Sequence, residues 1–200
     1  MLPLPDAKPL PISIAERRRL LEVARKAIVS AVAAGRVPDL YNVPGEAVRR
    51  CGVFVTIRTG RVLRGCIGKP ESPFPLEQTV ARCAALSALD DPRFPALRAE
   101  EIPGIEIEIS ILSPPVIMTS EQIEVGVHGL AVSAGEFRGL LLPQVAGEYG
   151  WDRERFLAET CRKAGLGPEA WRDPQTKIEG FTADVFSERE FLSGGAASSR

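Results

Sequence analysis

The sequence is poor in the residues that build metal and disulfide sites. Its 200 residues include one histidine, His128, and four cysteines. One chain therefore cannot supply a site of several histidines, and no two cysteines have the C-x-x-C spacing typical of structural zinc or iron–sulfur sites. We expect no metal site. Because a chain of this length can build a core without disulfides, we also expect reduced thiols in the cytoplasm.

Long apolar runs and an excess of one charge are also missing. No run approaches the ~20 apolar residues that span a bilayer, and Pro or charged residues fill most of the first nine positions, which argues against a secretion signal. The 25 basic and 26 acidic residues leave a net charge of -1, so neither a membrane nor nucleic acid is an expected partner. What remains is the composition of an ordinary globular protein, and it leaves the oligomeric state open.

Local patterns predict helices alternating with short strands. Ser13 and Glu16 have the spacing of a capping box, and Gly35 ends a stretch of helical apolar spacing, so we predict a helix over 14–34. The other predicted elements are a hairpin of 51–58 and 61–67, a helix over 75–88, a strand over 105–111, a hairpin of 130–133 and 137–142, a helix over 153–164 and a closing strand over 178–186. Short hairpins favour antiparallel pairing, so the predicted class is α+β, an antiparallel sheet with packed helices.

Charge is distributed unevenly along the chain. Residues 49–69 include six basic residues and no acidic one, whereas residues 100–124 include six acidic residues and no basic one. Opposite charges on neighbouring strands stabilise a sheet modestly. We therefore predict that the strand over 105–111 lies beside the hairpin of 51–67; an accident of composition is the alternative.

The segment L-R-G-C-I-G, Leu63 to Gly68, is the strongest candidate for chemistry. Glycines inside a strand, here Gly65 and Gly68, usually mark a bulge or a close approach of another backbone. In a regular strand Arg64 and Cys66 point to the same face, and a nearby cation favours the thiolate that a cysteine nucleophile requires. The alternative is that Cys66 is a small buried residue.

The remaining candidates are weaker on their own. Cys83 and Cys161 lie among apolar neighbours on predicted helices, which indicates core positions. His128 is suited to proton transfer near neutral pH and could pair with Cys66, although a lone histidine is more often a turn or packing residue. Glu108 shares a strand face with a second glutamate, which is typical of a solvated face and less often of acid–base chemistry.

Several motifs follow one another in a fixed order along the chain. They are Gly52-Val53-Phe54-Val55-Thr56 followed by Leu63-Arg64-Gly65-Cys66-Ile67-Gly68, Asp91-Pro92-Arg93-Phe94, Glu108-Ile109-Ser110, His128-Gly129, Gly139 to Ala146, and Gly150-Trp151-Asp152. Together they resemble the AMMECR domain family, the A component of AmmeMemoRadiSam systems, over residues 14–190. Lys69-Pro70 departs from the family pattern, in which many members carry a small residue and an aromatic one there.

The resemblance implies a single domain over 14–191, with two unequal lobes and a cleft between them. The four prolines of residues 1–12 and the small, polar residues of 193–200 predict flexible tails. The resemblance also implies association with a Memo-like protein and a radical SAM protein, but it supplies neither a reaction nor a cofactor. The family motifs map onto candidate catalytic residues and candidate binding residues. The catalytic candidates are Cys66, His128 and Arg64, and the binding candidates are Gly65, Gly68, Glu108 and Gln144.

Two functions remain open at this point. In the first, the protein is an enzyme component: Cys66 is a nucleophile or redox thiol, Arg64 stabilises its thiolate or an anionic substrate group, and His128 moves a proton. In the second, it is a non-catalytic module that binds a ligand or a protein, and the L-R-G-C-I-G strand is structural. The predicted fold serves both functions.

Overall fold

The computed structural model describes residues 12–37 and 51–192, which form two compact units. The larger unit contains the described residues up to Ile111 and those from Asp184 onward, and the smaller unit contains residues 112–183. The predicted tails lie almost entirely outside the described residues. Both units combine helices with antiparallel strand pairs, which confirms the α+β class. No helix among the described residues is both long and apolar enough to cross a membrane.

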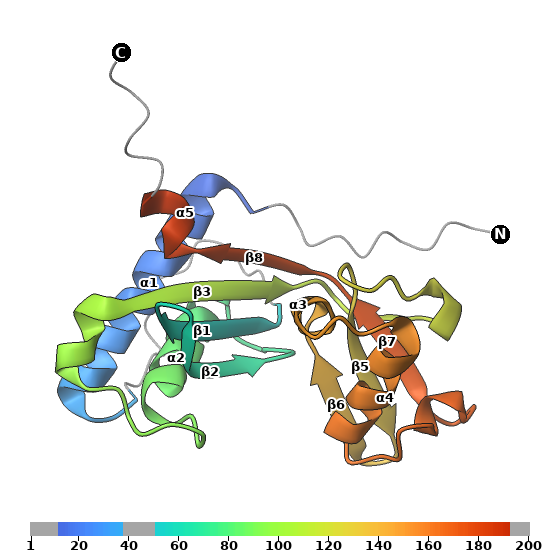
Figure 1. Ribbon diagram of the computed structural model, residues 1–200. Helices are drawn as coiled ribbons and strands as arrows, with labels where there is room; N and C mark the ends of the chain where they lie inside the picture. The colour runs from blue at the N-terminus through green and yellow to red at the C-terminus, as the bar shows by residue number, and fades with distance from the viewer. Residues whose placement is uncertain (1–11, 38–50, 193–200) are drawn as a thin grey trace. The chain divides into compact units, whose positions relative to one another are not determined.

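The larger unit is a four-stranded sheet with helices packed on one face (Figure 1). The order of its strands is β2-β1-β3-β8. They are β1 (Val53–Thr59), β2 (Val62–Lys69), β3 (Ile105–Leu112) and β8 (Ala183–Ser187), and the helices are α1 (Ile14–Ala34), α2 (Leu76–Leu89), the 3-10 helix η1 (Ala99–Gly104) and α5 (Glu188–Leu192). Alternate apolar side chains of β1 and β3 pack against α1 and α2 and form the core.

The first helix and the first hairpin form as predicted. Ser13 Oγ accepts a hydrogen bond from the N–H of Glu16 at 3.2 Å, and Gly35 closes α1 in the left-handed conformation with a φ of 63°. β1 pairs with β3 in antiparallel register, with Arg58 opposite Glu106. This pairing confirms that the acidic strand lies beside the basic hairpin.

The smaller unit is a second four-stranded sheet, in the order β4-β7-β5-β6. Its strands are β4 (Val116–Ile117), β5 (Gly129–Ala134), β6 (Phe137–Leu141) and β7 (Lys177–Phe181), and its helices are η2 (Ser120–Gln122), α3 (Pro143–Glu148), α4 (Arg153–Lys163) and η3 (Ala170–Arg172). The α4 helix contacts β5 and β6, where Phe156 and Leu157 share a buried cluster with Leu130 (Figure 1). The short elements β4, α3 and α5 were not among the predicted ones.

The prediction of one closing strand over 178–186 is wrong. The segment divides at Thr182 into β7 and β8, which belong to different sheets. The N–H of Thr182 donates to Ser113 Oγ at 2.9 Å, and its carbonyl accepts from the N–H of Ser113 at 2.9 Å. The backbone of Thr182 is therefore bonded to Ser113, while the loose alternation of the sequence continues across the break and conceals it.

Helix α2 approaches the hairpin closely because Gly65 has no side chain. A Cβ at Gly65 would lie 2.1 Å from the carbonyl oxygen of Ser87. The Ser87 hydroxyl accepts from the N–H of Ile67 at 2.8 Å and donates to the carbonyl of Val55 at 2.8 Å. One buried hydroxyl thus joins α2 to both strands of the hairpin.

We expect Ser87→Ala to lower the free energy of unfolding by about 1–2 kcal/mol, because the Ile67 N–H and the Val55 carbonyl lose a buried partner. Urea unfolding followed by circular dichroism measures the change. Ser30→Ala, on the exposed side of α1, is the control and should be neutral or slightly stabilising. If Ser87→Ala unfolds at the same urea concentration as the parent, the two hydrogen bonds of the Ser87 hydroxyl do not stabilise the protein.

Candidate functional site

A row of polar side chains crosses the face of the larger sheet that is turned away from the α1–α2 core. Thr56 of β1 pairs with Cys66 of β2 on one side and with Glu108 of β3 on the other. Directly paired residues have their side chains on the same face, so the three lie next to one another. Thr56 is buried, and Cys66 and Glu108 are half-buried. The row brings together two predicted site residues and adds Thr56, to which the sequence analysis assigned no role.

The Cys66 thiol differs in its surroundings from the other thiols. It accepts a hydrogen bond from Thr56 Oγ1 at 3.3 Å and stays partly exposed. Cys83 and Cys161 are fully buried, which confirms their core positions, and burial raises the pKa of both thiols, that of Cys83 to about 11. Cys51 packs against the core, and all four cysteines carry thiols rather than disulfides. Cys66 is therefore a partly exposed thiol on the sheet face that the core does not cover.

The outer edge of β2 at Cys66 is covered by Asp91 and Arg93, which we call the Asp91–Arg93 clamp. Since β2 is an edge strand, the outward backbone groups of Cys66 have no strand to pair with. The N–H of Cys66 donates to Asp91 Oδ2 at 2.8 Å, and its carbonyl accepts from Arg93 Nη2 at 3.1 Å. The clamp thus fixes the backbone that carries the thiol.

The Asp91 carboxylate is buried and surrounded by donors. Besides the Cys66 N–H, it accepts from the backbone N–H of Arg93 at 3.1 Å, from its Nε at 3.0 Å and from its Nη2 at 2.7 Å. These hydrogen bonds, chiefly those from the guanidinium, lower the pKa of Asp91 to about 2. The clamp is therefore an ion pair at neutral pH.

Arg64 lies at a β-bulge, not in a regular strand. The register of β1 and β2 shifts after Ile57, so Arg64 has no partner in β1. Its guanidinium donates to Glu101 at 2.7 and 3.1 Å and to the carbonyls of Pro95 and Ala96 at 2.8 and 3.3 Å. The prediction that Arg64 and Cys66 point to the same face assumed a regular strand. The bulge at Arg64 means that this assumption does not hold.

Arg64→Gln is expected to destabilise the protein by about 1–3 kcal/mol, because Glu101 loses its bidentate partner. The alkylation rate of Cys66 should stay unchanged, because the guanidinium is committed to the ion pair. Denaturant unfolding and peptide mass spectrometry after iodoacetamide treatment measure the two effects. Arg61→Gln, at the exposed hairpin turn, removes the same charge and should alter neither. A loss of Cys66 reactivity in Arg64→Gln alone would instead link Arg64 to the thiol.

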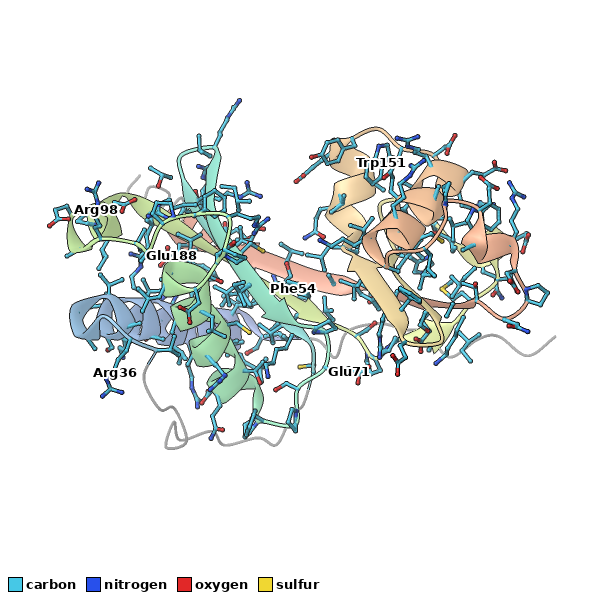
Figure 2. The ribbon with its side chains drawn as sticks, turned by 90° about the horizontal axis from the view of Figure 1, so that it is seen from below. Arg36, Phe54, Glu71, Arg98, Trp151 and Glu188 are labelled. Atoms are coloured by element: carbon cyan, nitrogen blue, oxygen red, sulfur yellow. The ribbon has the colours of Figure 1, made fainter. Side chains whose placement is uncertain are left out.

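The two glycines of the motif have packing roles. Gly65 allows the approach of Ser87, and a Cβ at Gly68 would lie 2.2 Å from the ring of Phe54, which is labelled in Figure 2. These contacts confirm the predicted close approach. Both glycines and Arg64 are thus used in packing and pairing, whereas the Cys66 side chain lies on the sheet face turned away from the core.

His128 and Gln144 belong to the smaller unit, whereas Cys66 belongs to the larger one. The N–H of His128 donates to the carbonyl of Glu124 at 2.9 Å, and its Nδ1 accepts from the N–H of Glu124 at 3.0 Å. His128 thus closes the turn before β5. Gln144 is half-buried in the first turn of α3. The pairing of His128 with Cys66 stays a prediction.

A cavity of about 750 Å³ in the larger unit does not include the polar row. It is lined by residues of α1, β3 and α5, where Arg25 pairs with Glu188 and Arg189 pairs with Glu106. Within residues 12–37 and 51–192, no three His, Cys, Asp or Glu side chains are grouped to hold a metal ion. The candidate site is the polar row with the Asp91–Arg93 clamp, because it contains the predicted residues Cys66 and Glu108.

The comparison with known proteins identifies the family of this chain. The AMMECR1 family model matches residues 21–186. The chain belongs to the AMMECR1 family. Protein PF1979 of Pyrococcus furiosus is 44% identical over 181 residues, which cover 84% of this chain and 86% of that protein. A protein of Methanothermobacter thermautotrophicus is 44% identical over 188 residues, covering 89% and 97%.

A solved AMMECR1-family structure has the same fold. The crystal structure of the uncharacterized protein PH0010 from Pyrococcus horikoshii matches with a TM-score of 0.78 at 43% identity, and the match covers 85% of this chain and 90% of that chain. The Cys66 row and the clamp both lie within the residues that the AMMECR1 model matches. The resemblance based on the sequence motifs is thus confirmed.

Proposed function

We propose that this AMMECR1-family protein is a thiol-dependent component of an AmmeMemoRadiSam system, with Cys66 as its nucleophile or redox thiol. The observation that supports the proposal is the thiol itself. It is half-exposed, accepts a hydrogen bond from Thr56, and sits on a backbone that the Asp91–Arg93 clamp holds. A nucleophile held in a fixed position loses little orientational freedom when it reacts.

In the proposed reaction, the thiol proton of Cys66 passes to a base and Sγ adds to an electrophilic double-bonded carbon of the substrate. The π bond of that carbon breaks, and its electron pair takes up a proton on the neighbouring atom. Glu108 is the carboxylate in the same row, and His128 is the side chain suited to proton transfer near neutral pH. We assign Glu108 to this proton transfer; proton transfer by His128 and binding by Gln144 stay predictions from the sequence. Arg64 supports the site through the loop that it pairs with.

The proposed partners are a Memo-like protein and a radical SAM protein in the cytoplasm. Both follow from the resemblance of the sequence motifs to the A component of AmmeMemoRadiSam systems. In such an assembly the radical SAM protein supplies the radical chemistry, and the present chain supplies a positioned thiol.

The test is a Cys66→Ala substitution in the assembled three-protein system. The readouts are cleavage of S-adenosylmethionine and formation of product. We expect product formation to fall to the level measured without this protein, while circular dichroism shows an intact fold. Cys51→Ala is the matched control, since it removes the other half-buried thiol. Full activity in Cys66→Ala would overturn the proposal.

A non-catalytic binding module is the second candidate function. The observation that favours it is that Gly65, Gly68 and Arg64 all have structural contacts. This function predicts saturable binding of a partner protein, with Cys66→Ser binding as well as the parent. Turnover that depends on the Cys66 thiol would exclude it.

A further inference from the structure

Arg93 has a fixed orientation and an open outer side. Its Nε and Nη2 donate to the two oxygens of Asp91 at 3.0 and 2.7 Å, and Nη2 also donates to the carbonyl of Cys66 at 3.1 Å. The ring of Phe94 lies 5.4 Å from the guanidinium carbon. Together these contacts hold the guanidinium in place, and none of them uses Nη1.

The exposure of the pair is strongly unequal. The Arg93 side chain is 54% exposed and that of Asp91 is 2% exposed, so the carboxylate anchors the guanidinium from the protein side. Among the residues that the structure describes, no acceptor contacts Nη1 of Arg93. Arg64 and Arg25 differ, since all three guanidinium nitrogens of each donate to carboxylate or carbonyl oxygens.

The open guanidinium lies against the backbone of Cys66. Its Nη2 donates to the carbonyl of Cys66 at 3.1 Å, so the cation is bonded to the residue that carries the thiol. A planar guanidinium suits carboxylate and phosphate oxygens. Because Asp91 already orders the side chain, an arriving anion pays little conformational entropy.

We infer that Arg93 binds an anionic group, a carboxylate or a phosphate, of the molecule on which Cys66 acts. The inference rests on the proposed function of Cys66 and adds the class of its substrate. It gives Arg93 the anion-binding role that the sequence analysis expected of Arg64. Arg93 is then a specificity-determining residue, because it selects substrates that carry a negative charge near the atom attacked by the thiol.

The test compares two alkylating reagents of similar size, anionic iodoacetate and neutral iodoacetamide. Peptide mass spectrometry gives the rate of each reagent at Cys66, and the ratio of the two rates isolates the effect of the carboxylate. We expect Arg93→Gln to lower this ratio by about threefold, the effect of losing one exposed ion pair. Arg93→Lys keeps the charge without the planar donors, and its ratio should lie between the other two.

Arg61→Gln is the matched control, because it removes the same charge from an exposed position on the hairpin that carries Cys66 and should keep the parental ratio. Protection of the buried Cys83 in the same digests reports an intact fold. If Cys66 reacts with both reagents and the ratio is parental in both Arg93 variants, the inference is overturned while the proposed function stands.

If Cys66 reacts with neither reagent, the proposed function fails. Binding of inorganic phosphate then tests separately whether Arg93 binds anions. A ³¹P NMR titration measures this binding. Saturable binding that is lost in Arg93→Gln and kept in Arg61→Gln supports the anion site. Equal binding, or no binding, in both variants and in the parent overturns it.

Discussion

Gly65→Ala is expected to destabilise the larger unit by about 3 kcal/mol. The added methyl group would lie 2.1 Å from the carbonyl oxygen of Ser87, which is backbone in α2 and cannot rotate away. Either α2 or β2 must shift, and such overpacking typically costs 1–3 kcal/mol, with more where neither element yields. A shift of α2 would also move Ser87 away from Ile67 and Val55, with which its hydroxyl is bonded.

Denaturant unfolding of Gly65→Ala and of Gly104→Ala measures this cost. A Cβ at Gly104 meets nothing within 4 Å, so the control adds the same methyl group without a clash and should leave the midpoint nearly unchanged. Equal midpoints for the two variants would contradict the packing role of Gly65.

Asp91→Asn is expected to lower the free energy of unfolding by about 2–4 kcal/mol at neutral pH. Asparagine would put an N–H donor where a carboxylate oxygen now accepts hydrogen bonds. The charge-assisted hydrogen bonds to Arg93 would also be lost in a buried position. The neighbouring Asp90→Asn is the control, since Asp90 is exposed and the change in charge is identical. Thermal or urea unfolding compares the two, and similar stabilities would show that the clamp is not stabilising.

The Asp91 contribution also depends on pH. Its pKa is about 2 in the folded protein against an ordinary value of 3.8, so the stabilisation is full above about pH 4 and is lost as the pH falls towards 2. The stability difference between the parent and Asp91→Asn should therefore narrow over that range. Glu101, whose pKa the Arg64 hydrogen bonds lower to about 2, titrates in both proteins and cancels in the difference. A constant difference from pH 5 to pH 2 would contradict the clamp.

Local signals in the sequence were sufficient for most helices and strands. The capping box at Ser13 and the strict alternation in β3 depend on neighbours within a few residues, and both elements form where they are expected. The uneven charge correctly predicted that β3 lies beside β1, because paired strands often carry side chains of opposite charge, here Arg58 and Glu106. The break at Thr182 was missed because it depends on Ser113, far away in the chain.

The candidate site was only partly predictable for the same reason. Cys66 and Glu108 were identified, but Thr56 joins them through the register of three strands, and Asp91 reaches Cys66 across 25 residues of chain. The expected role of Arg64 depended on a regular strand, and a one-residue bulge changes where its side chain pairs. Asp91 and Arg93, on either side of Pro92, do not point to a site in the sequence alone. Their role depends on the edge strand β2 that they cover.

The most direct test of the account is the alkylation rate of each cysteine in the folded protein, measured with iodoacetamide and mapped by peptide mass spectrometry. We expect Cys66 to react faster than the half-buried Cys51, while Cys83 and Cys161 stay protected until the protein unfolds. Protection of Cys66 to the same degree as Cys83 would contradict it, because a thiol that no small electrophile can reach cannot act on a substrate.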